Sequence, residues 1–570
     1  MPVYSDKNAV RQLTGLLLAH GIDHVVVAPG SRNAPLVQTF AAHPGFRCFC
    51  VTDERSAAFF ALGMILRRQE PVAVCCTSGT ALLNLGPAVA EAFYRELPLL
   101  VLSADRPAAW VGQMDGQTMP QPGIFGALAK CAVNLPEGDT SEDRWHANQL
   151  INKTLLALAP WKTARGFPGG GPAQINIPLR EPLFSFTDDA PEAARAIRLA
   201  AAPPRLDELP AALADIWRSS RKRLILAGQL LPARACRDFT ALEETVAAGD
   251  AVVVVEHLAN LRGEGVIRNP DAALAALDED EARKLAPDLL VTFGGHLVSK
   301  RMKQLLRAHR PAHHWHISPD RSAPDLFQAL TEVIETVPER FFPLLAHGHE
   351  AETEAYARRW REASHKACAA TEKIMESAPF TDMLALQLFL ARLPRGAALH
   401  LANSSTARNA QLFPLPGGVD VHCNRGMNGI DGSLSTAVGF AAVADEPVFV
   451  VIGDLSFFYD INALWNGHIG KNLRILLLNN GGGGIFHTLP GLGTASRLDM
   501  IAGHHDTSAG ALAASFGLVY ATASTREAFE ARLPWFTTEP DGPLLFEVKF
   551  PLDACAAFHA QFHQRLKDGR

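Results

Sequence analysis

Short apolar runs recur along the chain, and each is followed by turn or polar residues and then by a segment of helix length. Such runs lie at 24–28, 47–52, 72–76 and 97–102, then at 224–228, 252–255 and 289–295, and finally at 448–452 and 475–478. Continuous apolar runs of this length are typical of buried parallel strands, and strands that alternate with helices are typical of α/β folds. The pattern therefore predicts parallel sheets flanked by helices.

The chain is long enough for several domains. Its 570 residues exceed what one hydrophobic core organises, which predicts about three domains. A stretch rich in Pro and Ala at 180–204 is typical of a linker, and we predict domains at 1–182, 205–345 and 375–570. Gly294-Gly295 stands before a helical segment and could contact a dinucleotide, but the absence of a GxGxxG motif there favours a tight turn.

The first and last thirds of the chain contain a repeat at a constant spacing of 376 residues. Arg32-Asn33-Ala34 recurs as Arg408-Asn409-Ala410, Gly63 recurs as Gly439, and the pattern at 71–74 recurs at 447–450. Agreement at one spacing favours two copies of one domain over chance. The same spacing aligns Glu54 with Ile430 and Ser78 with Asp454, so we expect a shared fold with different chemistry in each copy.

Polar residues follow two neighbouring apolar runs of the last third. Asp454 comes directly after the run at 448–452, and Asn480 with four glycines follows the run at 475–478. Parallel strands present their carboxyl ends at one edge of a sheet, where α/β folds bind ligands. Carboxylate, amide and carbonyl oxygens suit Mg²⁺ bound to phosphate, and glycines allow close approach to an anion. The alternative is an aspartate that caps a helix and a flexible glycine turn.

Composition narrows the possible functions. The chain is 48% hydrophobic and 20% charged, with a net charge of -6 and no dense basic tract, so we expect no nucleic-acid binding. Its nine cysteines form no CxxC pair and are expected to be small hydrophobic residues, buried in strands at Cys48, Cys50 and Cys75-Cys76. The first residues lack a basic segment before a long apolar run, and no stretch reaches about 18 apolar residues. We therefore expect a cytoplasmic protein without membrane insertion.

The paired Gly-Asp and Asn-Asn segments resemble the diphosphate-binding signature of thiamine diphosphate enzymes. This resemblance implies thiamine diphosphate and Mg²⁺, with Mn²⁺ as an alternative, and metal ligands at Asp454, Asn480 and Gly482. It implies that Glu54, in DER at 53–55, is the catalytic glutamate that hydrogen-bonds the cofactor's aminopyrimidine. It further implies that Ile430 supports the bent cofactor, and that the remaining cofactor contacts are Asn403, Ser404, Leu455, Ser456 and Ile485.

Longer motifs narrow the resemblance. They are APGSRNAPL at 28–36, SADRP at 103–107, GQTMPQPG at 116–123, SKR at 299–301, NSSTAR at 403–408, NRGMNGIDG at 424–432 and IFHTLPG at 485–491. Together they resemble the 2-succinyl-5-enolpyruvyl-6-hydroxy-3-cyclohexene-1-carboxylate synthases of menaquinone biosynthesis. These transferases decarboxylate 2-oxoglutarate on thiamine diphosphate and add the product to isochorismate, releasing CO₂.

The cations in these motifs suit substrates with several carboxylates. We place all of them at strand ends or in loops, where guanidinium groups can bind carboxylates bidentately. The resemblance implies that Ser404, Arg408 and Arg425 hold the succinyl end of 2-oxoglutarate. It implies that isochorismate is held by Arg32, Arg106, Gln117 and Lys300, and that Arg301 is a further substrate-binding residue.

Two alternatives remain at this stage. The first is another thiamine diphosphate enzyme, such as an acetolactate-synthase-like enzyme or a simple 2-oxoacid decarboxylase, which would not need this set of arginines. The second is a cofactor-binding regulatory protein without turnover, for which a missing Glu54 would be the sign; Glu54 is present. The resemblance also implies a homodimer with shared active sites, or a homotetramer.

Overall fold

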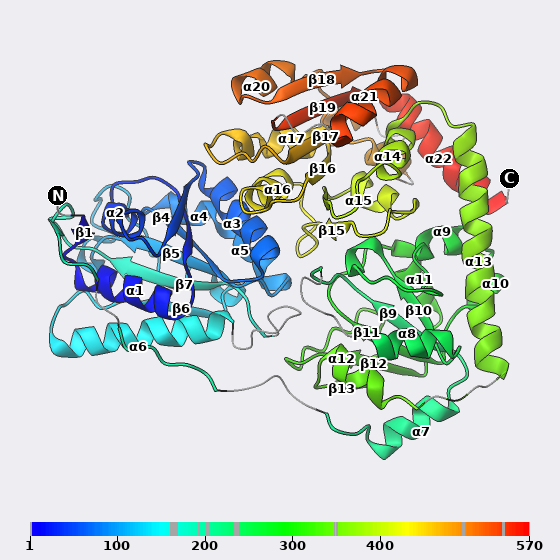
Figure 1. The fold of residues 1–570 in the computed structure, drawn as a ribbon, viewed down its shortest axis with the longest axis horizontal. Coiled ribbons are helices and arrows are strands. Elements are labelled where there is room, and N and C mark those ends of the chain that lie inside the picture. The colour runs from blue at the N-terminus through cyan, green and yellow to red at the C-terminus, as the bar shows by residue number, and fades with distance from the viewer. Residues whose placement is uncertain are drawn as a thin grey trace.

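The computed structural model describes residues 3–159, 169–191, 194–200, 206–232, 239–346, 348, 351–489, 491–492, 496–538 and 542–568. The chain forms three α/β units, each built on its own sheet. The first unit covers residues 4–187, the central unit 211–344 and the last unit 382–568. In Figure 1 the first unit lies at the left, the last at the upper right and the central unit at the lower right.

The first unit contains a six-stranded parallel sheet of order β3-β2-β4-β5-β7-β6. A two-stranded antiparallel sheet, β1 with β8, lies at its margin. The strands are β1 Tyr4–Ser5, β2 His24–Val27, β3 Arg47–Cys50, β4 Val72–Cys76, β5 Leu99–Asp105, β6 Cys131–Asn134, β7 Ala173–Pro178 and β8 Phe186–Thr187. The helices are α1 Asn8–Ala19, α2 Ala34–Ala42, α3 Glu54–Arg68, α4 Thr80–Asn84, α5 Gly86–Tyr94 and α6 Ser141–Leu158.

The last unit repeats this topology in a sheet of order β15-β14-β16-β17-β19-β18. Its strands are β14 Ala398–Leu401, β15 Asp420–His422, β16 Val448–Gly453, β17 Leu473–Asn479, β18 Val519–Ala523 and β19 Leu544–Lys549. Its helices are α14 Asp382–Leu390, α15 Ser405–Ala410, α16 Ser433–Ala441, α17 Asp454–Tyr459, α18 Ile485–Thr488, α19 Leu498–Ala502, α20 Gly510–Ser515, α21 Arg526–Thr538 and α22 Leu552–Asp568. The common strand order agrees with the predicted repeat.

The strand pairing of the two copies differs at one strand. Val448 pairs with Leu473 in the last unit, whereas its counterpart Val72 pairs with Leu99. The spacing of 376 residues would have placed that partner at Leu97, so the fourth strand of the first sheet is shifted by two positions relative to the repeat. The predicted run at 97–102 accordingly begins and ends earlier than β5.

The central unit has a parallel sheet of order β10-β9-β11-β12-β13. Its strands are β9 Arg223–Ala227, β10 Val252–Val255, β11 Leu289–Phe293, β12 His313–Ile317 and β13 Glu332–Ile334, and its helices are α7 Ala211–Ser219, α8 Thr240–Ala247, α9 Pro270–Ala275, α10 Glu279–Lys284, α11 Lys300–Ala308 and α12 Pro338–Phe341. Gly294 follows β11 in a left-handed conformation (φ +78°), which agrees with the predicted tight turn.

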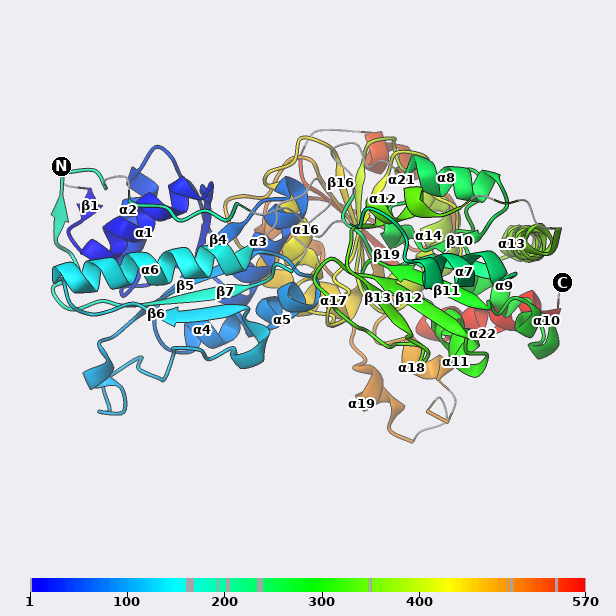
Figure 2. The ribbon, with the colours of Figure 1, turned by 90° about the horizontal axis from the view of Figure 1, so that it is seen from below.

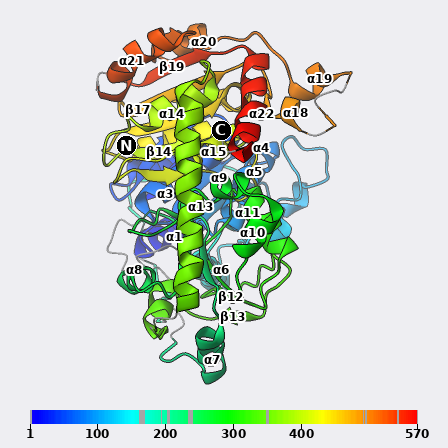
Figure 3. The same cartoon turned by 90° about the vertical axis from the view of Figure 1, so that its right-hand side faces the viewer.

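A long helix connects the central and last units. α13, Ala351–Glu376, contacts α9 of the central unit and α22 of the last. Figure 3 shows it running along both units. Its buried Trp360 and Ile374 belong to a hydrophobic core that also includes Leu224 of the central sheet and Phe546 of the last sheet. These two units therefore share one core.

The first and last units are joined through two equivalent helices, α3 and α16. Phe60 and Phe440 are buried in one apolar cluster that contains side chains of both units. Gly63 and Gly439, which correspond in the repeat, allow the helices to touch: a Cβ at Gly63 would lie 1.9 Å from the Thr436 carbonyl oxygen, and one at Gly439 would lie 2.0 Å from that of Phe60. Glycine at both positions therefore sets the distance between the units.

Two predictions about local structure were wrong. The segment between the last two apolar runs was expected to be one helix, but it contains α17 and a short 3₁₀ helix, Ile461–Leu464. Gly467 and Gly470 follow in that segment, and glycine disfavours helix continuation. Cys50 is exposed and not buried, because β3 is an edge strand of its sheet.

The predicted position of the cations in loops was also wrong for three of them. Lys300 and Arg301 begin α11, where the Ser299 side chain accepts the Met302 N–H at 3.1 Å. Arg408 lies in α15. A serine before a helix is a frequent N-cap, so this signal was present in SKR.

Figure 2 shows α18 and α19 projecting from the body of the last unit. Among the described residues, no helix combines the length and the apolar character needed to cross a membrane.

We predict that Gly63→Ala destabilises the protein. The added Cβ would meet main-chain atoms of α16, which cannot be relieved by a side-chain rotation, and such overpacking costs about 2 kcal/mol or more. Chemical denaturation of the full chain measures this free energy of unfolding. Gly86→Ala is the control, since no atom lies within 4 Å of its added Cβ; equal losses in the two variants would contradict the close contact between α3 and α16.

Candidate active site

Asp454 connects the ends of two neighbouring strands. It begins α17 directly after β16, and its Oδ1 accepts the Leu455 N–H at 2.6 Å. Its Oδ2 accepts the N–H groups of Asn480, Gly481 and Gly482 at 3.0, 2.7 and 3.0 Å, just beyond β17. The two polar strand ends therefore meet, as their positions in the sequence predicted.

Burial and hydrogen bonding act in opposite directions on the pKa of Asp454, and burial prevails, so that the pKa is raised. Its side chain is only 4% exposed, and burial raises the pKa of the carboxyl group. The backbone N–H groups and the nearby His505, whose Nε2 lies 3.6 Å from Oδ2, lower that pKa. Because both oxygens accept from N–H donors, the hydrogen bonds favour the ionised form.

The orientation of the Asn480 side-chain amide determines which atom, oxygen or nitrogen, faces Asp454 and the Gly482 carbonyl. One end of the amide lies 3.3 Å from Asp454 Oδ2 and 2.7 Å from the Gly482 carbonyl oxygen. With nitrogen at that end, the amide donates to both oxygens. With oxygen at that end, three oxygens converge, and a hard divalent cation among them would stabilise the arrangement. The predicted metal-binding residues are thus adjacent, and their donor set fits Mg²⁺.

The predicted cofactor residues of the last unit surround the same strand ends. The Ser456 hydroxyl donates to the Ile430 carbonyl at 2.5 Å, which fixes Ile430 next to α17 while its side chain stays 39% exposed. Asn403 donates to the carbonyls of Asn424 and Gly429 at 2.6 and 2.7 Å. Ser404 has a positive φ of 73°, a conformation that is costly for a residue other than glycine and is frequent at functional sites. Leu455 follows Asp454 in α17, and Ile485 begins α18.

Glu54 lies in the first unit, at the start of α3. The preceding Asp53 caps this helix by accepting the Ser56 N–H at 2.9 Å. Asn84 donates to Glu54 Oε2 at 3.4 Å. Arg55 instead contacts the last unit: it donates to the Tyr459 carbonyl at 2.7 Å and lies over that ring at 4.5 Å. The half-buried Glu54 carboxylate therefore stands at the edge of the contact between the two units.

One group of predicted substrate residues lies in the first unit. Arg32 is 5% exposed, donates to the Leu179 carbonyl at 3.1 Å and pairs with Glu181 at 3.2 Å. Arg106 pairs with Asp115 at 3.2 Å. Burial lowers the pKa of Arg32, and the nearby Arg106 lowers it further. Gln117 follows in the same loop as Asp115, in a left-handed conformation (φ +56°).

The second group gathers in the last and central units. Arg408 donates to the Ser404 hydroxyl at 3.2 Å, and Arg425 donates to Asn403 Oδ1 at 3.0 Å. Burial lowers the pKa of Arg408, and so does the adjacent positive charge of Arg425. Arg425 is buried and Arg408 is half-buried, and two like charges so placed are electrostatically unfavourable until an anion binds between them.

Lys300 and Arg301, the predicted substrate residues of α11, differ in whether their positive charge already has an ionic partner. Arg301 pairs with Asp271 at 2.7 Å, and that carboxylate also accepts the Ser299 hydroxyl at 2.6 Å. Arg301 therefore already has an ionic partner, whereas the Lys300 ammonium makes no hydrogen bond or ion pair within the part of the chain that the structure describes. Among those residues, no hydrogen bond or ion pair joins the Arg32–Arg106 group to the Arg408–Arg425 group.

Comparison with known proteins identifies the family. The model of the thiamine pyrophosphate enzyme N-terminal TPP binding domain matches residues 7–126, and that of the C-terminal TPP binding domain matches residues 404–548. A 2-succinyl-5-enolpyruvyl-6-hydroxy-3-cyclohexene-1-carboxylate synthase from Bacteroides fragilis is 46% identical, with 99% of this chain and 100% of the relative covered. The chain belongs to this synthase family.

More distant proteins agree with this assignment. A synthase of the same name from Desulfotalea psychrophila is 40% identical over 95% of this chain and 98% of its own. A solved structure of an enzyme from Mycobacterium smegmatis, described as thiamin diphosphate-dependent, has a TM-score of 0.66 at 17% identity and covers 96% of this chain and 99% of its own. The latter supports the fold alone. The predicted family, fold class and use of thiamine diphosphate are confirmed, while the roles of individual residues stay predictions.

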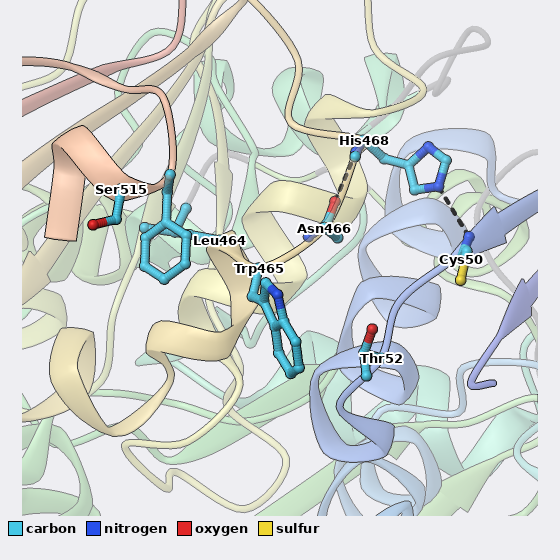
Figure 4. Close-up of a pocket in the computed structure, with 9 residues that line it drawn as sticks. Cys50, Thr52, Leu464, Trp465, Asn466, His468 and Ser515 are labelled. Atoms are coloured by element: carbon cyan, nitrogen blue, oxygen red, sulfur yellow. Dashed lines mark hydrogen bonds between the residues drawn. The ribbon is translucent and has the colours of Figure 1, made fainter. Parts of the chain in front are cut away.

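A cavity of about 500 Å³ lies elsewhere in this synthase, where the first and last units meet (Figure 4). It is lined by Cys50 and Thr52 from the first unit and by residues 464–468, Ser515 and Phe516 from the last. The Cys50 N–H donates to His468 Nε2 at 2.9 Å. None of the lining residues was predicted to bind substrate or cofactor, so this cavity is a feature of the contact between the units.

Sequence reasoning missed two residues that the structure places at the site. His505 approaches Asp454, and Glu91 of α5 binds the backbone after Arg425. Neither has a signal in the sequence: His505 follows another histidine in a polar stretch, and Glu91 is one acid in an alanine-rich helix.

We predict different effects for two substitutions of Asp454. Asp454→Ala leaves the N–H groups of Asn480, Gly481 and Gly482 without their acceptor, which should lower the free energy of unfolding of the cofactor-free protein by about 1–3 kcal/mol. Asp454→Asn retains one acceptor oxygen and should lower it less. Both variants lack the carboxylate and should bind thiamine diphosphate with Mg²⁺ weakly in calorimetry. Wild-type affinity in the Asn variant would contradict a role for the charge.

Proposed function

We propose that the protein catalyses the reaction of its family name. It would decarboxylate 2-oxoglutarate and join the remaining four-carbon unit to isochorismate, giving 2-succinyl-5-enolpyruvyl-6-hydroxy-3-cyclohexene-1-carboxylate and CO₂. The observation that carries this proposal is the pair of adjacent arginines, the half-buried Arg408 and the buried Arg425, next to Ser404 and Asn403. The loop that contains Arg425 also contacts α17, the helix that Asp454 begins, because the Ser456 hydroxyl of α17 donates to the Ile430 carbonyl of the loop.

The residues at the two strand ends would hold the cofactor. Bound thiamine diphosphate supplies the carbon nucleophile for decarboxylation and carbon–carbon bond formation. Asp454, Asn480 and the Gly482 carbonyl would bind Mg²⁺ or Mn²⁺, because an Asp454 oxygen and the Gly482 carbonyl oxygen both lie next to the Asn480 amide, whose own oxygen would turn toward the cation. The exposed side chain of Ile430 would support the cofactor ring. Glu54 would hold the proton at the aminopyrimidine N1′ atom.

The two groups of cations would divide the substrates. Ser404, Arg408 and Arg425 would bind the distal carboxylate of 2-oxoglutarate. Arg32, Arg106, Gln117 and Lys300 would bind isochorismate, which carries two carboxylates. Arg301 is assigned a supporting part, because Asp271 already neutralises it. A decarboxylase of simple monocarboxylate 2-oxoacids would have no use for the adjacent pair of arginines.

The active site is proposed to lie between two chains. Glu54 belongs to the first unit and Asp454 to the last, and one cofactor must contact both. Within one chain, the faces of α3 and α16 are already packed on each other through Gly63 and Gly439. Leu83 and Ile430, near the two predicted halves of the site, have exposed apolar side chains. A C₂ dimer would cover such surfaces and form two sites, each with residues from both chains.

The direct test is incubation of the full chain with both substrates, thiamine diphosphate and Mg²⁺, followed by mass measurement of the product. We expect the mass of the named carboxylate together with CO₂ release. Glu54→Gln should bind the cofactor but lose about 10²-fold or more of the turnover, because Gln cannot share a proton with N1′. Activity of this variant within a few-fold of wild type would rule out the role of Glu54, and consumption of 2-oxoglutarate without the named product would favour a simple decarboxylase.

The shared site predicts recovery of activity from two inactive variants. Chains with Glu54→Gln and chains with Asp454→Ala are mixed, dissociated and allowed to pair again. Each mixed dimer would have one site with both substitutions and one with neither, so random pairing should restore about a quarter of wild-type activity. Sites built within one chain would always retain a substitution. No recovery, with mixed dimers seen by native mass spectrometry, would therefore rule out the shared site.

A further inference from the structure

The loop from Cys423 to Gly432 is held by side chains from all three units. We call it the Arg425 loop. Gln229 of the central unit donates to the Cys423 carbonyl at 2.8 Å. Asn403 of the last unit donates to the carbonyls of Asn424 and Gly429. The first unit contributes Glu91, which contacts the backbone just after Arg425.

Glu91 binds the two backbone groups that directly follow Arg425. Its Oε1 accepts the Gly426 N–H at 3.0 Å and its Oε2 accepts the Met427 N–H at 2.8 Å. The residue is 2% exposed. The approach is so close that a Cβ at position 426 would lie 2.8 Å from both the Glu91 carbonyl oxygen and Oε2. Gly426 is therefore required by this contact.

The ionised form of Glu91 is the one that satisfies the contact. Burial raises the pKa of its carboxyl group, and Arg95, the two N–H groups and Arg425 offset part of that rise. Both oxygens accept hydrogen bonds, which a protonated carboxyl group could do only by directing its own hydrogen elsewhere. Arg95 is also buried, and its nearest nitrogen lies 3.9 Å from the carboxylate, farther than either N–H group.

The guanidinium of Arg425 keeps one N–H group available to a ligand. Its Nη1 donates to Asn403, but its Nε is buried without a partner among the described residues. A buried guanidinium N–H without an acceptor is costly unless a ligand supplies one. The backbone at Arg425 sets where this side chain begins, and the bond from Nη1 to Asn403 holds its guanidinium end, so a shift of the backbone would change the position of that N–H.

We propose that Glu91 is a positioning residue for substrate binding, which acts by fixing the backbone behind Arg425 so that the guanidinium meets a carboxylate of 2-oxoglutarate. This inference rests on the proposed function. The first unit would then act at two sites. Its Glu91 would support the substrate residues on the last unit of the same chain, and its Glu54 would complete the site of the partner chain.

The test compares steady-state kinetics of Glu91→Gln and wild type in the full-length protein with thiamine diphosphate and Mg²⁺. Gln has the size of Glu but offers one acceptor, so its amide NH₂ would face one of the two loop N–H groups. We expect the KM for 2-oxoglutarate to rise about tenfold or more, and the KM for isochorismate to rise less. A lower unfolding temperature with both KM values unchanged would assign Glu91 to domain packing and overturn the proposal.

A double-mutant cycle separates this proposal from the proposed function. Arg425→Ala should also raise the KM for 2-oxoglutarate, and adding Glu91→Gln to it should raise that KM no further, because Glu91 acts through Arg425. Independent effects of the two substitutions would overturn the role of Glu91. If Arg425→Ala itself leaves this KM unchanged, the assignment of Arg425 to the substrate fails, whatever Glu91 does.

Gly426→Ala provides a second approach from the other side of the contact. Its added Cβ would press on Glu91 Oε2, so the loop must shift and the KM for 2-oxoglutarate should rise as in Glu91→Gln. This variant keeps the proposal testable if Glu91→Gln does not fold. An unchanged KM in Gly426→Ala would contradict the requirement for this contact.

Discussion

The organisation of the site depends on the carboxylate of Asp454. Four backbone N–H groups converge on it, one from the start of α17 and three from the residues that follow β17. A carboxylate buried to this extent would be unfavourable without such donors, because burial alone raises its pKa. Its hydrogen bonds in turn determine the course of the glycine loop after Asn480. The charge and the loop therefore stabilise each other, and a cation or diphosphate would bind to an arrangement that already exists.

The second constraint is the packing of the three units around the Arg425 loop. Gly63 and Gly439 allow α3 and α16 to touch, and this contact brings the first unit against the last. Only with the units in that relation can Glu91 reach Gly426 and Met427. The position of Arg425 is consequently a property of the whole chain and not of the last unit alone.

The repeated fold explains the arrangement of the substrate cations. Arg32, which is buried, and Arg408, which is half-buried, occupy equivalent positions of the two copies, and each lies near a second arginine, Arg106 and Arg425 respectively. In both copies burial lowers the pKa of the arginine, and the neighbouring charge adds to the effect. The same topological position thus carries paired positive charge in both copies, and this is the charge that the proposed substrates, two acids with several carboxylates each, would neutralise.

The sequence by itself determined the elements and their chemistry. Apolar runs gave the parallel strands, the spacing of 376 residues gave the common topology, and the position of Asp454 and Asn480 after two such runs placed them at one sheet edge. These features are local or periodic, so they can be read from the order of residues. The tertiary structure alone decided the partners: Glu91 lies 335 residues before the Gly426 that it binds, and Arg301 is neutralised by Asp271 of another helix. Such contacts depend on how units pack, and no local pattern of polar and apolar residues encodes that distance or direction.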